Sequence, residues 1–263
     1  MLMQDIALAG ISTTKHNLSS NGVSGNNKFS GTTEICVFCH TPHGANISIP
    51  VPAPLWNRNF STATYATYAS LGTSSLDAKA AATGSVSLAC LSCHDGTQAM
   101  DIMINTPGSG TDPVGFPTTG TWSISGQFST GALNTRITYI GVDLTNDHPI
   151  GIQYCGGGVS TTALDGPCIN DPDFKVAPNL QHSGTGVNTT WWIETNGNTT
   201  RELTDLRLYT RADTLAYDGV TAITGGSQPY VECASCHDPH NNNTTFLRIP
   251  NEGSAVCLSC HIK

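Results

Sequence analysis

The 263-residue sequence predicts an irregular fold, mostly coil with short helices and few short strands. Three observations lead to this prediction. Gly, Ser, Thr and Asn crowd long stretches of the chain, including 27 glycines, and such residues favour turns and loops. The apolar runs are short. Finally, a Cys-x-x-Cys motif recurs four times, so bound groups could replace part of the usual apolar core.

Every Cys-x-x-Cys pair is followed directly by a histidine. Because only 9 of the 263 residues are histidine, four such coincidences have a chance of roughly one in a million. The pairs are Cys36/Cys39, Cys90/Cys93, Cys233/Cys236 and Cys257/Cys260, and the histidines are His40, His94, His237 and His261. The repetition points to one chemistry that is used four times.

Covalent haem attachment accounts for both the spacing and the histidine. Two thiols three positions apart each add to one vinyl group of a haem, and the next residue then supplies a proximal imidazole to the iron. The sequence therefore predicts four covalent c-type haems and a haem-cored multihaem cytochrome c. Two all-cysteine zinc sites are the alternative, but zinc gives no reason for the four histidines. A thioredoxin-type dithiol needs one motif and not four.

The other predicted elements follow in chain order. LDAKAAA at 76–82 predicts a short helix, and brief helical turns are expected at the motifs. The apolar runs ITYIGV, at 137–142, and WWI, at 191–193, predict strands, and Asn196-Gly197 predicts a turn. We expect a single domain over 1–263, with the haems in two groups separated by residues 95–232, and an apoprotein that does not fold.

Five further histidines are available for the four remaining axial positions. They are His16, His43, His148, His182 and His240. His43 and His240 each stand three residues after a proximal histidine. Three residues span at most about 11 Å, so neither can easily reach the far face of the haem that its neighbour binds.

Each of these two histidines should therefore serve an adjacent haem. We expect two tightly stacked haem pairs, with His43 on the second iron and His240 on the fourth. His16 and His148 would complete the first and third irons, in an order that the sequence does not give. His182 is the surplus one. Solvated turn histidines are the alternative, and Met100 or Met103 could instead supply sulfur.

Cys155 and Cys168 bound a Gly-rich stretch and belong to no Cys-x-x-Cys motif. In an oxidising compartment they predict a disulfide that closes a short loop, worth about 3 kcal/mol. Two unpaired buried cysteines are the alternative.

Composition limits the partners. The formal charge is −8 and only 11% of residues are charged, so nucleic acid is not an expected partner. No run of 18 apolar residues occurs, and we expect no membrane span. Haem attachment requires export, so we expect that a leader has been removed. Some arginines should bind haem propionates, and the candidates are Arg58, Arg136, Arg201, Arg207, Arg211 and Arg248.

Several phrases resemble the tetrahaem cytochromes of the doubled Cys-x-x-Cys-His type, and among them the OmcE-like proteins of extracellular cytochrome filaments. The matching phrases are KHNLS from 15, CVFCHTPHGA from 36, PLWNR from 54, CLSCHDGT from 90, HPIG from 148, CASCHDPH from 233 and CLSCH from 257. The resemblance implies distal ligands at His16, His43, His148 and His240. It also implies that one axial histidine passes between subunits, for which His16, in the N-terminal segment 1–20, is the candidate.

These features predict electron transfer as the function. The leading hypothesis is a homopolymeric, head-to-tail filament at the cell surface or outside the cell, which passes electrons to redox partners or extracellular acceptors. A soluble periplasmic tetrahaem shuttle is the alternative. A multihaem reductase would need an iron with an open face, which the histidine count does not imply, so we expect no enzyme.

Overall fold

The computed structural model describes most of the chain. The described residues are 10–48, 53–72, 80–100, 102–108, 120–123, 138–159, 161, 167–168, 170–176, 178–185, 189–211 and 228–262. Most of them form turns, bends and irregular coil between short helices and strands, which confirms the predicted fold class. No helix in these ranges is long and apolar enough to cross a membrane.

The helices are few and short, and the cysteine motifs lie in them. The α-helices are α1 (Ser85–His94), α2 (Cys233–Cys236) and α3 (Ala255–Cys260). The 3-10 helices are η1 (Gly10–Thr13), η2 (Cys36–Phe38), η3 (Tyr68–Leu71), η4 (Tyr154–Gly156), η6 (Thr244–Phe246) and η7 (Glu252–Ser254). The four motifs fall in η2, α1, α2 and α3, which confirms that brief helical turns carry them.

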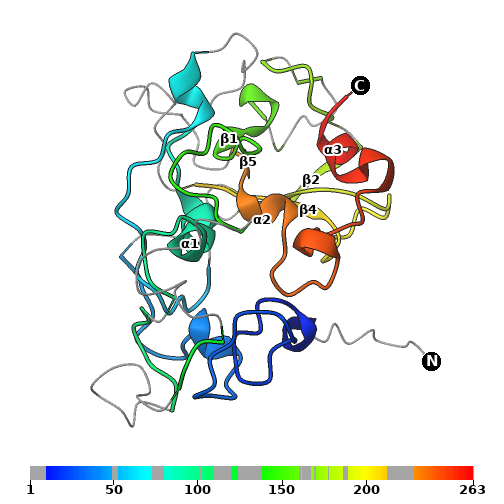
Figure 1. The fold of residues 1–263 in the computed structure, drawn as a ribbon. Coiled ribbons are helices and arrows are strands. Elements are labelled where there is room, and N and C mark those ends of the chain that lie inside the picture. Colours follow the sequence, from blue (N-terminus) through cyan, green and yellow to red (C-terminus); the bar gives the residue numbers. More distant parts are fainter. Residues whose placement is uncertain are drawn as a thin grey trace, which may run out of the picture.

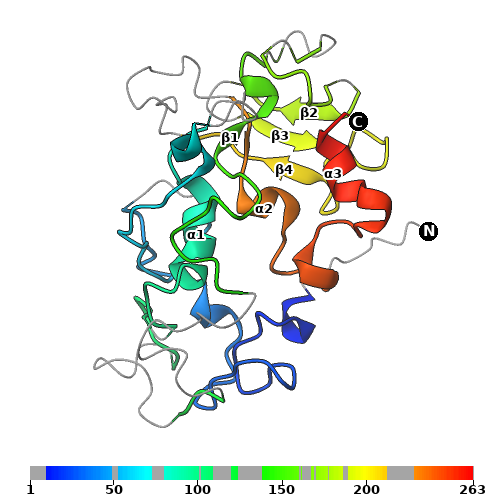
Figure 2. The same cartoon turned by 45° about the horizontal axis from the view of Figure 1, so that its top comes forward.

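Two small antiparallel sheets lie in the C-terminal two thirds of the chain. β2 (Leu180–Ser183), β3 (Thr190–Ile193) and β4 (Leu206–Leu208) form a three-stranded sheet in that order, and β1 (Ile152–Gln153) pairs with β5 (Tyr230–Val231). Figure 2 shows β2, β3 and β4 side by side, close to α2 and α3. The WWI run is part of β3, as predicted, and Asn196-Gly197 lies in the loop to β4.

The three-stranded sheet has an apolar core of its own. Trp191, Ile193 and Leu206 are fully buried. They belong to one cluster with Tyr154, Phe174 and other residues from β1 to α3. Three consecutive residues of β3, Trp191 to Ile193, are buried, so this sheet has apolar packing besides any bound group.

Two predicted elements differ from the structure. Residues 76–79 of the expected 76–82 helix lie outside the described residues, and Ala80 forms an isolated bridge with Ile152 in place of a helical turn. The described part of the 137–142 run is not a strand. The backbone amides of Ile140 and Gly141 donate to the carbonyl oxygen of His94, at 2.9 and 3.3 Å, so the run covers the end of α1.

Candidate functional site

The first motif, in η2, is fixed by residues 54–57. The amide of Asn57 donates to the carbonyl of Cys39 (2.8 Å), and His40 pairs with Trp56 in an isolated antiparallel bridge. The Asn57 side chain donates to the carbonyl of Val37 at 2.6 Å. Nδ1 of His40 donates to the carbonyl of Pro54 at 2.7 Å, so the ring proton is on Nδ1. Nε2 then carries the lone pair that can bind a metal.

The second motif ends α1 and is tied to the first by a buried arginine. Arg58, only 1% exposed, donates to the carbonyls of Ser92, Ala99 and Met100. Nδ1 of His94 donates to the carbonyl of Thr138 at 2.8 Å, so this ring also keeps Nε2 free. The two terminal nitrogens of Arg58 are thus bonded to backbone carbonyls, while its buried Nε has no partner.

The third motif, α2, packs against α1 through a buried ion pair. Arg211 and Glu232 are 3.2 Å apart with both side chains at 0% exposure, and Ser87 of α1 donates to the other Glu232 oxygen at 2.5 Å. Glu232 also forms a capping box with Ser235. Nδ1 of His237 donates to the carbonyl of Thr245 at 2.7 Å.

The fourth motif, in α3, lies beside the sheet core. The amide of Lys175 donates to the carbonyl of Cys260 at 2.7 Å. His261 forms an isolated bridge with Phe174, and the two rings stack with their centroids 5.1 Å apart. The aromatic side of the apolar core therefore forms one wall of this motif.

The four motifs follow one another through the molecule. The thiols of Cys39 and Cys93 are close enough to interact electrostatically, which links the first and second motifs. The thiols of Cys90 and Cys233 are within hydrogen-bonding contact, which links the second and third. Cys236 interacts electrostatically with Cys257 and Cys260 of α3, which links the third and fourth. In Figure 1 the blue segment of the first motif lies at the bottom, with α1, α2 and α3 following upward. The predicted division into two groups is wrong, since α1 and α2 are in contact although residues 95–232 separate them in sequence.

Two pairs of histidine rings are spaced as axial ligands of one metal would be. The ring centroids of His40 and His240 are 6.4 Å apart with an angle of 17° between the planes, and those of His16 and His94 are 6.1 Å apart at 82°. Metal–nitrogen bonds of about 2 Å on each side of an iron give a centroid separation of about 6 Å. The residues therefore fit two bis-histidine haems.

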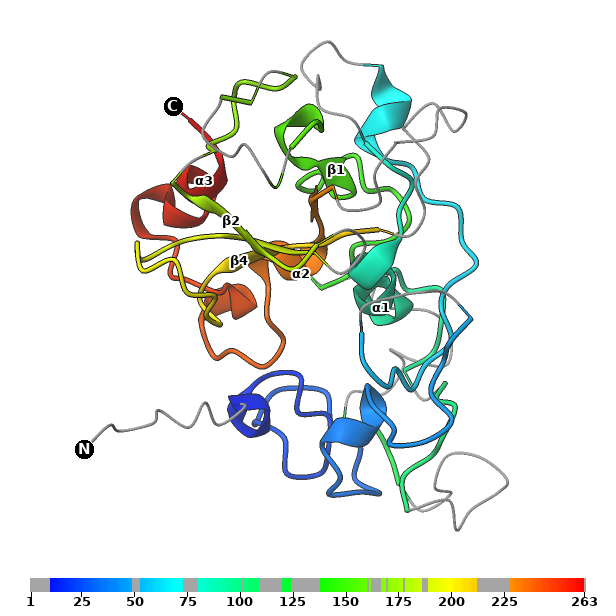
Figure 3. The same ribbon diagram turned by 180° about the vertical axis from the view of Figure 1, so that it is seen from behind.

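This pairing corrects the expected one. His240 faces the first motif and not the fourth, while His16 faces the second and not the first or third. The physical reason is a contact that spacing cannot reveal: the N-terminal segment packs on the segment after α2, where Asn242 donates to Thr13 at 2.8 Å and His16 contacts Phe246 at 4.3 Å. Figure 3 shows these blue and orange segments next to each other.

His148 and His43 differ in their surroundings. The side chain of His148 is exposed, and its Nδ1 donates to the carbonyl of Pro149 at 2.9 Å. Its pKa is lowered by desolvation first, and then by the nearby His261 and His237. His43 is exposed, and within the described part of the chain its ring has no hydrogen bond or ring contact. His148 is thus close to two motifs, whereas His43 meets none.

Burial favours the neutral form of two candidate ligands, His16 and His94, and the neutral form is the one that binds metal. Burial lowers the pKa of His16 to about 4, with help from the adjacent His94 and His240. Burial also lowers the pKa of His94. Neutral imidazoles at neutral pH are therefore ready to bind iron without a proton having to leave.

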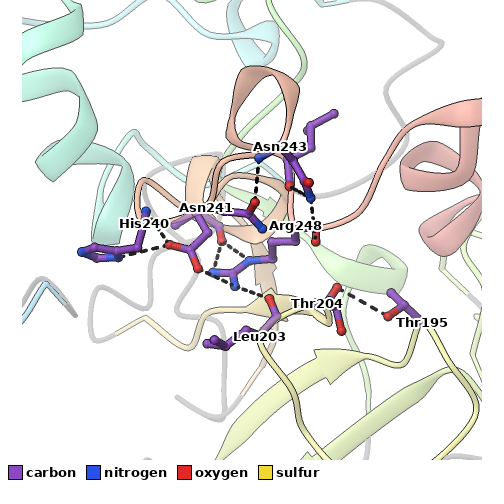
Figure 4. A network of polar contacts seen from close by, with 10 residues as sticks. Thr195, Leu203, Thr204, His240, Asn241, Asn243 and Arg248 are labelled. Carbon is purple, nitrogen blue, oxygen red and sulfur yellow. Dashed lines mark hydrogen bonds and ion pairs between the residues drawn. The ribbon is translucent and has the colours of Figure 1, made fainter. Parts of the chain in front are cut away.

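His240 has an acidic hydrogen-bond partner. Its Nδ1 donates to Asp238 at 3.1 Å, and Arg248 lies 3.7 Å from the other oxygen of the same carboxylate. Figure 4 shows His240 and Arg248 in one polar network. The hydrogen bond from His240 is the main reason why the pKa of Asp238 is lowered. Sequence reasoning missed Asp238, although it stands two residues before a candidate ligand.

Two other candidate ligands from the sequence, His182 and Met103, are in contact with other parts of the chain. Nε2 of His182 faces the carbonyl of Thr161 at 3.1 Å, and the ring packs on Trp191. Met103 packs beside the apolar cluster of Phe29, Val37 and Phe38. The Nε2 of His182 is therefore engaged by a carbonyl, and Met103 lies in an apolar cluster.

The two remaining cysteines and the other arginines are also accounted for in part. Cys155 and Cys168 form a disulfide. Arg248 donates to the carbonyls of Ala234 and Leu203. Arg207 lies over the ring of Tyr209, its guanidinium carbon 4.8 Å from the ring centroid, and Arg201 is exposed. Arg136 lies outside the described residues.

Comparison with known protein families supports this reading of the motifs. Residues 228–263 match the model of the doubled CXXCH motif, which covers the third and fourth motifs. A search of curated proteins gave no match. The doubled motif indicates a multihaem c-type cytochrome that binds haem c covalently and transfers electrons.

Proposed function

We propose that the protein binds four haems at its four motifs and conducts electrons as the repeating subunit of a filament at the cell surface or outside the cell. The four motifs follow one another without a break from η2 to α3. An electron could therefore cross the subunit in short steps between neighbouring haems. The periplasm is the alternative location.

The filament part of the proposal rests on one observation: the histidine ligands of a single chain do not pair off completely. His240 faces His40 and His16 faces His94. The proximal histidines of the last two motifs then remain, and His148 is the candidate near both. One iron is left without a second histidine from its own chain.

His43 is the histidine that can complete that iron from outside. It is exposed and meets no other ring among the described residues. It stands three residues after His40 in the sequence, and the first motif is at the other end of the motif series from α3. A neighbouring subunit that inserts His43 would join the end of one haem series to the start of the next. His43 therefore replaces His16 as the proposed intersubunit ligand.

No substrate chemistry is proposed. With two imidazoles assigned to every iron in the assembly, no axial position is left for a substrate. The chain's own residues would hold the cofactors: cysteines would anchor them, and backbone carbonyls orient the proximal rings of His40, His94 and His237 through Nδ1.

The test is electron microscopy of the haem-loaded protein together with His43→Ala, with His182→Ala as the matched control. The wild type and H182A should form uniform filaments. H43A should give discrete particles. Its electron paramagnetic resonance spectrum should show a high-spin ferric signal from one haem in four, while a pyridine haemochrome assay still counts four haems per chain. Filaments of H43A without that resonance would exclude His43 as the intersubunit ligand. Discrete wild-type particles at every concentration would favour the soluble shuttle.

A further inference from the structure

One candidate ligand differs from the others in what its Nδ1 meets. The rings of His40, His94, His148 and His237 donate to backbone carbonyls, which are neutral. The ring of His240 donates to the carboxylate of Asp238 at 3.1 Å. In the part of the chain that the structure describes, no other histidine ring has a carboxylate partner.

We propose that Asp238 is a positioning residue that lowers the reduction potential of the haem at the first motif, the one His40 and His240 would share. This inference rests on the ligand assignment in the proposed function. A carboxylate that accepts the Nδ1 proton makes the imidazole more basic and a better electron donor to the metal. It therefore stabilises ferric over ferrous iron, since hydrogen bonding around the axial ligand tunes the potential.

The surroundings of Asp238 preserve this effect. Its side chain is 14% exposed, so water screens the charge only in part. Arg248, 11% exposed, lies 3.7 Å from the far oxygen and offsets some of the negative charge. Arg248 itself is held by the carbonyls of Ala234 and Leu203, as Figure 4 shows for Leu203. Asp238 should thus lower the reduction potential of this haem, and Arg248 should raise it.

A purely structural role for Asp238 has to be separated from this one. The same carboxylate oxygen also accepts the backbone amide of His240 at 2.9 Å, which stabilises the turn. Asp238→Asn keeps an oxygen acceptor for that amide and removes the charge. Reduction of the haem adds one electron, taken from an adjacent ferrous haem, and the Nδ1 proton stays on His240 in both states.

The experiment is a spectroelectrochemical titration of the haem-loaded protein carrying D238N, Arg248→Gln or Asp147→Asn. D238N should raise one of the four midpoint potentials by about 59 mV, which for one electron is a tenfold change in the ratio of ferric to ferrous haem. R248Q should move the same midpoint downward. D147N removes an exposed charge next to His148, whose Nδ1 meets a carbonyl, and should move none.

A fourth variant, His240→Ala, separates the two ways in which the inference can fail. H240A should produce a high-spin ferric resonance worth one haem in four. If it does so while D238N leaves all midpoints in place, the tuning role is wrong and the ligand assignment stands. If H240A stays fully low-spin, the ligand assignment itself is wrong.

Discussion

The sheet region, β2 to β4, and the first-motif region, residues 10–72 as far as described, are built on different principles. In the sheet region Trp191, Ile193 and Leu206 are fully buried. In the first-motif region the cluster around η2 has three buried apolar residues, Phe29, Val37 and Phe38, and side chains such as Asn57 bond to backbone carbonyls instead. The comparison teaches that one region carries an apolar core of its own, whereas the other has only a small apolar cluster and relies on polar side-chain bonds.

Withholding haem should produce the largest difference in stability between the two regions. In apoprotein made without haem attachment, we expect residues 10–48 to exchange their amide hydrogens rapidly, because little apolar burial holds them. Peptides from β2 to β4 should stay measurably protected. Hydrogen exchange followed by mass spectrometry reads both regions in one sample. Equal exchange in both regions would show that the sheet also depends on haem.

Trp191→Ala should damage the sheet region alone. The side chain is fully buried, and truncation of a buried tryptophan costs about 3–5 kcal/mol. Denaturant unfolding followed by far-ultraviolet circular dichroism should detect this loss, while amide hydrogen exchange over residues 36–41, in the first-motif region, should stay as in the wild type. Leu203→Ala, at a side chain that is 62% exposed, is the control and should change the unfolding free energy by under about 0.5 kcal/mol. Faster hydrogen exchange over residues 36–41 in W191A would contradict the separation of the two regions.

Asn57→Ala tests the polar bonding of the first-motif region and should have the smallest effect. The carbonyls of Val37 and Asn105 would lose their donor. An unsatisfied buried group costs about 1–3 kcal/mol. The loss should appear as faster hydrogen exchange over residues 36–41, with none in β3. Asn198→Ala, at an exposed side chain in the β3–β4 loop, should leave both regions unchanged.

Residue patterns in the sequence are enough to predict the local features of the site. The Cys-x-x-Cys-His motifs predict helical turns, which the structure has, and WWI predicts β3. These succeed because the motif chemistry and β-branched or aromatic runs act over a few residues. ITYIGV has the same apolar character, yet it covers the end of α1, since its role depends on what it packs against.

Ring pairing could not be predicted in this way. The three-residue spacing of His40 and His43 limits only how far apart they can lie. Which ring faces His40 depends on the contact of the N-terminal segment with residues 238–246, and nothing local encodes that contact. Asp238 could have been noticed as an acid beside a ligand, but its direction toward Nδ1 is set by the turn.

The facing rings of His40 and His240 also order the assembly of the protein in time. Synthesis proceeds from the N-terminus, so the first Cys-x-x-Cys-His motif leaves the ribosome long before residue 240. Its haem would be attached while the second axial ligand is still unmade. A chain truncated before residue 240 would therefore carry an exposed, five-coordinate iron at its first motif, a chemical mark that separates unfinished chains from complete ones.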